Sequence, residues 1–145
     1  MHPANPIEQI LISPSNMGKM IQDINTRIPE EACGLLAGKN RTSNVQVEIA
    51  IPMTNVLHSP SKFLLDPKEQ YDGFSWMDRH GLELVGVYHS HPDGTPYPST
   101  TDLDEAFYPE IIHVIWAKVD EKWICKAFVL EATRFREIEV QSAKT

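Results

Sequence analysis

Cysteine is scarce in this sequence of 145 residues, and basic clusters and long hydrophobic runs are absent. The two cysteines, Cys33 and Cys125, lie far apart without CxxC spacing, which argues against both a disulfide framework and a thiolate metal site. No run of eighteen apolar residues occurs, and the N-terminus lacks the basic flank and apolar stretch of a secretory signal. We therefore expect a cytoplasmic protein with two buried, reduced thiols.

The charge is unevenly balanced, with 13 basic and 20 acidic side chains and a formal net charge of −7. Such a surface repels phosphate backbones and anionic lipids, so neither nucleic acid nor membrane is expected as a partner. A partner with a basic face or a flexible peptide tail fits better. The length and the 41% apolar composition predict a single domain over residues 1–145, with its core at about 8–140.

The first helix is marked by Ser13, a typical cap, and by Pro14, which suits the first turn. Apolar residues then recur at steps of three and four, and Pro29 ends the pattern. We expect this stripe to belong to the core: Met17, Met20, Ile21, Ile24 and Ile28.

Short apolar runs and turn signals alternate along the rest of the chain. Asp66 and Pro67 predict the start of a second helix that Gly81 ends, with Tyr71, Phe74 and Met77 on one face. Strands are expected at 32–38, 45–51, 82–88, 111–119, 123–130 and 135–140, with turns at 39–41 and 120–122. This order predicts a mixed α/β domain with one central sheet flanked by helices.

The most informative stretch runs from His89 to Asp102. Residues i and i+2 of an extended segment share a face, so His89 and His91 can bring two imidazoles to one point. Three prolines and a glycine then form an irregular loop that returns the chain to Ser99 and Asp102. Two imidazoles and a carboxylate are a known catalytic zinc set, with a water in the fourth position.

Ordinary explanations exist for the same residues. An HxH pair at a strand edge can be two polar side chains, and SxxD is also a helix capping box. The capping role is compatible with metal binding, because one helix start can fix the Asp102 rotamer and deliver it to the ion. A hydrolytic site also needs a base beside the water. Spacing alone leaves four candidates unranked: Glu30, Glu31, Asp93 and Glu105.

The motifs resemble those of a known family. The segment from Glu31 to Gly38, His89-Ser90-His91-Pro92, seven residues, and Ser99-x-x-Asp102 together resemble the signature of the JAMM (MPN+) zinc metalloproteases. Asn55 and the segment from Phe63 to Pro67 are similar to the short bacterial members. The resemblance extends from Ile10 to about Val140.

The resemblance implies one Zn²⁺ per chain with a bound water, held by His89, His91 and Asp102. It implies that Glu31 is the general base and acid, and that Ser99 donates a hydrogen bond to the developing oxyanion. It also implies a cytidine-deaminase-like fold, with a mixed central β-sheet and flanking helices.

The implied activity is cleavage of peptide or isopeptide bonds after the Gly-Gly tail of ubiquitin or of ubiquitin-like, sulfur-carrier-type β-grasp proteins. A tail of this kind could lie extended between the 55–66 segment and the 92–98 loop, where Phe63, Leu65 and Tyr97 are substrate-binding candidates. Two alternatives are a zinc hydrolase of small peptides or amides and a non-catalytic scaffold of the same fold. The sequence is also compatible with a homodimer.

Overall fold

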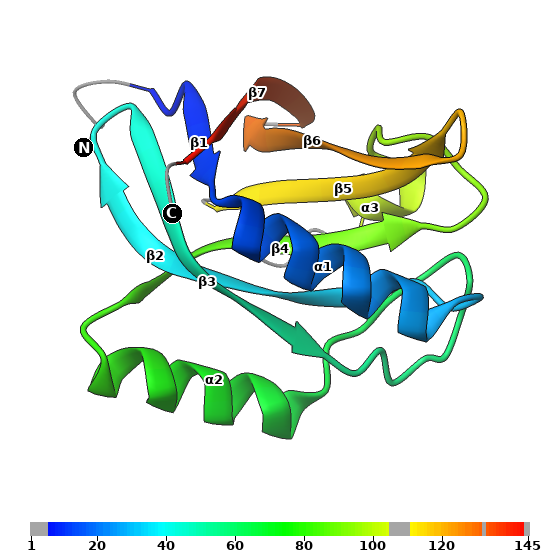
Figure 1. Cartoon of the computed structure of the whole chain (residues 1–145), viewed down its shortest axis with the longest axis horizontal. Coiled ribbons are helices and arrows are strands. Elements are labelled where there is room, and N and C mark those ends of the chain that lie inside the picture. Colours follow the sequence, from blue (N-terminus) through cyan, green and yellow to red (C-terminus); the bar gives the residue numbers. More distant parts are fainter. Residues whose placement is uncertain (1–5, 105–110, 132, 144–145) are drawn as a thin grey trace.

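The structure is a computed structural model of the chain, and it describes residues 6–104, 111–131 and 133–143. The described residues form seven strands and three helices (Figure 1). In chain order these are β1 (Gln9–Ile12), α1 (Pro14–Arg27), β2 (Cys33–Arg41), β3 (Asn44–Met53), α2 (Pro67–Arg79), β4 (Glu83–His91), α3 (Thr100–Asp104), β5 (Ile112–Val119), β6 (Lys122–Glu131) and β7 (Arg134–Ser142).

The strands form one mixed sheet in the order β1-β3-β2-β4-β5-β6-β7, and β1 pairs with β7 to close it into a barrel. The pairs β2–β3, β2–β4, β5–β6 and β6–β7 are antiparallel, whereas β1–β3, β4–β5 and β1–β7 are parallel. The predicted combination of a mixed sheet with helices is therefore confirmed. β4 lies inside the sheet, paired on both sides, which makes it a rigid support for the residues at its end.

Helix α1 begins where the sequence predicted, because the Ser13 hydroxyl accepts a hydrogen bond from the Asn16 amide at 3.1 Å. Met20 and Ile24 are fully buried, and Met17 and Ile21 pack against the same cluster. The prediction was wrong for Ile28, which is 47% exposed. The helix ends at Arg27, and Ile28 adopts φ −49° and ψ 133°, the extended conformation that a following proline favours. Its side chain therefore leaves the buried stripe.

The hairpin of β2 and β3 turns later than predicted. The residues expected in the turn, 39–41, continue β2 and pair with 44–46, while Thr42 at φ 50° and Ser43 make the turn. The side chains of 39–41 are exposed where the hairpin approaches its turn, so their polarity indicated solvent and not a turn. The hairpin of β5 and β6 is confirmed, with its turn at Asp120 and Glu121.

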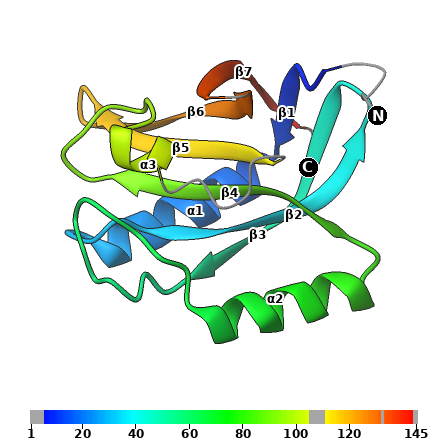
Figure 2. The ribbon, with the colours of Figure 1, turned by 180° about the vertical axis from the view of Figure 1, so that it is seen from behind.

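Two hydrophobic clusters lie on opposite faces of the central strands. The first contains Met20 and Ile24 of α1 with Leu36 and Tyr88, and the second contains Leu35, Val87 and Met77 of α2. Figures 1 and 2 show α1 and α2 on different sides of β2 and β3. Because side chains alternate along a strand, neighbouring residues of β2 and β4 serve different clusters.

Helix α2 starts at the predicted position, with the Asp66 carboxylate accepting hydrogen bonds from the amides of Lys68 and Glu69. Met77 is buried, but Tyr71 is 71% exposed, so it does not share the buried face. The buried position one turn before Met77 is Gly73, which lets α2 approach Met53 closely. None of the helices in the described ranges combines the length and the apolar character needed to cross a membrane.

Candidate active site

Strand β4 continues three residues beyond its predicted end, as far as His91, and this extension carries both histidines. His89 and His91 share one face, and their Nε2 atoms lie 3.1 Å apart. Their Cα partners on β5 are Ile115 and Ala117, so regular pairing holds the backbone of this segment. Both imidazoles are at most 9% exposed. The expected convergence of the two rings is present.

Asp102 reaches the histidines from the first turn of α3. Ser99 and Asp102 form a reciprocal capping box, in which the Ser99 amide donates to Oδ2 at 2.8 Å and the Asp102 amide donates to the Ser99 hydroxyl at 3.0 Å. Oδ1 lies 3.1 Å from His89 Nε2, and Oδ2 lies 3.1 Å from His91 Nε2. The capping box of Ser99 and Asp102 therefore both stabilises the start of α3 and places the Asp102 carboxylate against both imidazole rings.

These three side chains fit a small divalent cation. An ion in tetrahedral coordination with bonds of about 2.0–2.1 Å keeps its ligand atoms about 3.3 Å apart. The separations between the two imidazole nitrogens and the Asp102 oxygens are all 3.1 Å. A carboxylate oxygen of Glu31 lies within 4.8 Å of the ligand nitrogens of His89 and His91. Nitrogen and oxygen donors in this arrangement suit zinc.

Glu31 is buried immediately before β2, and within the described part of the chain its Oε1 has no hydrogen-bond partner. Burial raises its pKa to about 8, with the negative charge of Asp102 adding to this rise and His91 opposing it. The other base candidates are less well placed. Glu30 pairs with Nδ1 of His58 at 3.1 Å, Asp93 is exposed, and Glu105 lies outside the described residues.

The surroundings shift the pKa values of His89, His91 and Asp102 in different directions. Burial lowers the pKa of His89 even though Asp102 accepts a hydrogen bond from it. Burial also disfavours the charged form of His91, but its bonds to Asp102 and to the Thr95 carbonyl raise its pKa overall. Desolvation works against the Asp102 carboxylate, yet hydrogen bonds from both histidines hold its pKa well below the ordinary range. Two neutral imidazoles and an ionised carboxylate are the forms that bind zinc.

The three substrate-binding candidates lie in different environments. Phe63 stacks on the His89 ring, with centroids 4.6 Å apart and planes 23° from parallel. Leu65 is 5% exposed and belongs to the second hydrophobic cluster. Tyr97 is 49% exposed and contacts Phe128 at a centroid distance of 6.1 Å. Phe63 therefore touches the site, Tyr97 is a half-exposed residue of the loop that leads to Ser99, and Leu65 is core.

Several residues fix the backbone and the rings of the site, but the sequence analysis assigned them no role there. The hydroxyl of Ser90 accepts from the Ala32 amide at 2.8 Å, which fixes the backbone next to Glu31. The Asn55 side-chain amide donates to the Glu31 carbonyl at 3.1 Å. The Thr95 carbonyl lies 2.7 Å from His91 Nδ1. The buried position of Ser90 between two histidines was the available signal, since an inward polar residue on a central strand requires a partner.

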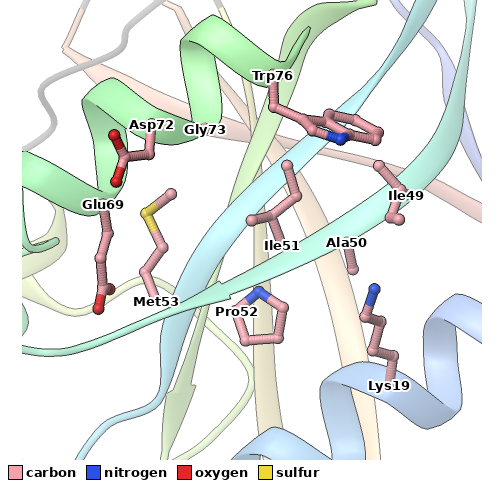
Figure 3. Close-up of a pocket in the computed structure, with 10 residues that line it drawn as sticks. All are labelled: Lys19, Ile49, Ala50, Ile51, Pro52, Met53, Glu69, Asp72, Gly73 and Trp76. Carbon is pink, nitrogen blue, oxygen red and sulfur yellow. The ribbon is translucent and has the colours of Figure 1, made fainter. Parts of the chain in front are cut away.

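A cavity of about 430 Å³ lies away from the histidines, at the edge of β3 between α1 and α2. In Figure 3, Lys19 approaches from α1, and Trp76 of α2 lies over Ile49 and Ile51. Glu69 closes one end by accepting hydrogen bonds from the Thr54 amide and hydroxyl. None of the predicted site residues lines this cavity.

Comparison with known proteins places this geometry in a family. A family model described as prokaryotic homologs of the JAB domain matches residues 13–131. The chain belongs to this prokaryotic JAB family. The JAMM (MPN+) resemblance of the motifs is thereby confirmed, and Glu31, His89, His91, Ser99 and Asp102 all lie within the matched range.

Relatives of this chain have named activities. A desampylase of Pyrococcus furiosus is 34% identical over 133 residues, which cover 90% of this chain and 89% of the relative. A probable TtuB-protein conjugate cleaving protease of Thermus thermophilus is 40% identical over 79 residues, covering 54% of this chain and 50% of the relative. The predicted class of enzyme, a protease, is confirmed by these relatives.

A solved structure agrees with the fold of this chain. The solution structure of a protein from Desulfitobacterium hafniense superimposes with a TM-score of 0.86 at 30% sequence identity, covering 94% of both chains. The arrangement of the sheet and helices is therefore shared over nearly the whole chain.

Proposed function

We propose that this chain is a zinc-dependent peptidase or isopeptidase that hydrolyses the bond after the Gly-Gly tail of a ubiquitin-like β-grasp protein. The observation that carries this proposal is the convergence of His89, His91 and Asp102 within 3.1 Å of one another, beside a buried Glu31 whose Oε1 has no partner in residues 6–104, 111–131 and 133–143. Buried polar atoms without partners cost stability, so a group of this kind is expected where function requires it.

His89 and His91 would hold the ion through Nε2, and Asp102 would complete the protein ligands. When bound, zinc supplies a water molecule acidic enough to lose a proton near neutral pH. The Glu31 carboxylate would accept that proton and pass it to the leaving amine. Its burial supports this role, because a buried carboxylate with a raised pKa holds a proton at neutral pH better than an exposed one.

Ser99 is proposed as a donor to the oxyanion. Its hydroxyl oxygen accepts from the Asp102 amide, which leaves the hydroxyl hydrogen available for the substrate. The residue is exposed at the start of α3, on the chain that brings Asp102 to the histidines. A donor in this position stabilises charge that develops in the transition state.

The substrate class rests on the relatives, whose names describe a desampylase and a protease that cleaves protein conjugates. The formal charge of −7 is compatible with a protein partner that presents a basic face. Phe63 and Tyr97 are proposed contacts for the extended tail. Leu65 is not proposed again, because its side chain lies in the core.

The test compares wild type with Glu31→Gln on two substrates, a β-grasp protein with a short extension after Gly-Gly and an unrelated small peptide. We expect zinc at about one ion per chain in both proteins, and cleavage of the β-grasp substrate reduced by about 10²–10⁴-fold in the variant. A preference for the small peptide would favour a general peptidase. Retained zinc without cleavage of either substrate by wild type would favour a non-catalytic scaffold.

The proposal also includes the fold family and the extent of the domain. We propose a cytidine-deaminase-like arrangement and a single domain over residues 1–145, supported by the mixed sheet and by the two helices on its opposite faces. The cytoplasmic location, the homodimer and the absence of nucleic-acid and membrane partners stay predictions from the sequence.

A further inference from the structure

The two proposed histidine ligands are supported differently. Nδ1 of His91 is 2.7 Å from the Thr95 carbonyl, which fixes the tautomer and the plane of that ring. Asp102 is fixed by its capping box with Ser99. Nδ1 of His89 is buried and has no hydrogen-bond partner among the residues that the structure describes. The usual polar support of a metal-binding histidine is therefore absent from His89.

Phe63 occupies the face of the His89 ring. The two rings stack with centroids 4.6 Å apart and planes 23° from parallel, while His91 meets the same imidazole edge-on at 4.9 Å. His89 is only 2% exposed. A flat aromatic surface against one face restricts rotation of the imidazole about χ2 and keeps water from the ring.

Asn55 holds Phe63 from both of its neighbours. Its side-chain oxygen accepts from the Leu64 amide at 3.1 Å, and its side-chain nitrogen donates to the Lys62 carbonyl at 2.9 Å. The same nitrogen donates to the carbonyl of Glu31. Asn55 is 1% exposed, so these bonds are protected from water. One buried amide thus links the loop that carries Phe63 to the backbone of the proposed base.

We propose that Phe63, clamped by Asn55, is a positioning residue that orients His89 for metal binding in place of a hydrogen bond to Nδ1. This inference rests on the proposed metal site. It assigns Phe63 a structural role toward the ion in addition to any contact with a substrate tail. Leu, which fills part of the same space without a flat face, should let the His89 ring rotate, whereas Tyr should keep it in place.

The test measures metal binding and not turnover. Zinc affinity is determined by chelator competition, and the visible spectrum of the cobalt-substituted protein reports ligand geometry. We expect Phe63→Leu to weaken zinc binding by about tenfold and to change the cobalt spectrum, which is the lower end of the loss typical for supporting residues. Phe63→Tyr should restore both. Phe63→Met carries the same expectation as Phe63→Leu and replaces it if that variant does not fold.

Phe74→Leu is the matched control, because Phe74 is a partly buried phenylalanine packed against the same second cluster. It should lower the melting temperature and leave zinc affinity and the cobalt spectrum unchanged. If the Phe63 variants behave like Phe74→Leu, the positioning role is wrong while the metal site stands. If wild type binds neither metal, the proposed function itself fails, and the two failures are distinguishable.

Discussion

Tyr88 and His89 are adjacent on β4 but belong to two different groups of buried polar residues. The groups differ in whether their polar atoms have hydrogen-bond partners. Tyr88 donates from its hydroxyl to Asp23 Oδ2 at 2.7 Å, and Arg27 Nε donates to Oδ1 at 3.1 Å, so each oxygen of that carboxylate has a partner. We call Asp23, Arg27 and Tyr88 the tyrosine cluster. His89, the next residue, lies in a group where its own Nδ1 and Glu31 Oε1 have no partner among the described residues.

The difference separates a structural from a functional use of buried polarity. A satisfied buried carboxylate costs little and fixes α1 against β4. Buried atoms without partners cost about 1–3 kcal/mol each, and packing alone gives no reason to keep them. A metal-bound water at the histidine site would give Glu31 Oε1 a partner, whereas His89 Nδ1 lies on the other side of its ring from the proposed ligand atom Nε2. A variant of the tyrosine cluster should therefore change the unfolding free energy, whereas a variant of Asp102 at the histidine site should change zinc affinity.

The largest effect is expected from Asp102→Asn. The amide keeps the shape of the carboxylate and can still accept from the Ser99 amide, but it lacks the charge that a cation requires. We expect zinc affinity to fall by more than about 100-fold, beyond the loss typical of a supporting residue, with peptide cleavage lost in parallel. Metal titration of the purified variant checks this. Undiminished affinity would remove Asp102 from the ligand set.

A smaller effect, on stability instead of metal binding, is expected from Tyr88→Phe. The substitution leaves Asp23 Oδ2 buried without its donor, which should cost about 1–3 kcal/mol of unfolding free energy. Zinc content should not change. Chemical denaturation of metal-free protein measures the cost, and Tyr71→Phe is the matched control because Tyr71 is 71% exposed. Equal stability of the two variants would mean that the tyrosine cluster is not structural.

A stability effect of similar size is expected from a change of pH in the metal-free protein. Burial raises the pKa of Glu31 in the folded state to about 8 from its ordinary value of 4.5, so folding favours the protonated form. This contribution is fully present below about pH 4.5 and is lost as pH rises through 8. Wild type should therefore lose stability relative to Glu31→Gln across that range, by about 2 kcal/mol after allowance for relaxation. Parallel stability curves for the two proteins would contradict a raised pKa.

Local signals in the sequence predicted much of the fold. Ser13 and Pro14 started α1, Asp66 and Pro67 started α2, and the apolar runs gave the strands. Predictions of strand ends failed where polar residues were taken to lie beyond the strand. Residues 39–41 were polar because the hairpin end is exposed, and the histidines of β4 were polar because they face a site. The closure of the barrel by β1 and β7 has no signal in residue spacing, whereas the exposure of Ile28 follows from Pro29, the next residue, and not from the apolar spacing.

The candidate site was predictable to the extent that its geometry is local. Alternation along a strand brought His89 and His91 together, and the capping box placed Asp102. Glu31 is far away in sequence, and spacing could not choose it from the other carboxylates. Its backbone is held by Ser90, through a bond to Ala32 across 58 residues of sequence, and by Asn55, through a bond to Glu31 itself across 24. Such contacts follow from the completed fold.

X-ray absorption at the zinc edge of the purified protein tests the metal centre most directly. We expect about one zinc per chain, bound only to nitrogen and oxygen at about 2.0–2.1 Å, with outer-shell scattering from two imidazoles. A protein that holds no zinc after reconstitution, or a first shell that contains sulfur from Cys33 or Cys125, would contradict the site built from His89, His91 and Asp102.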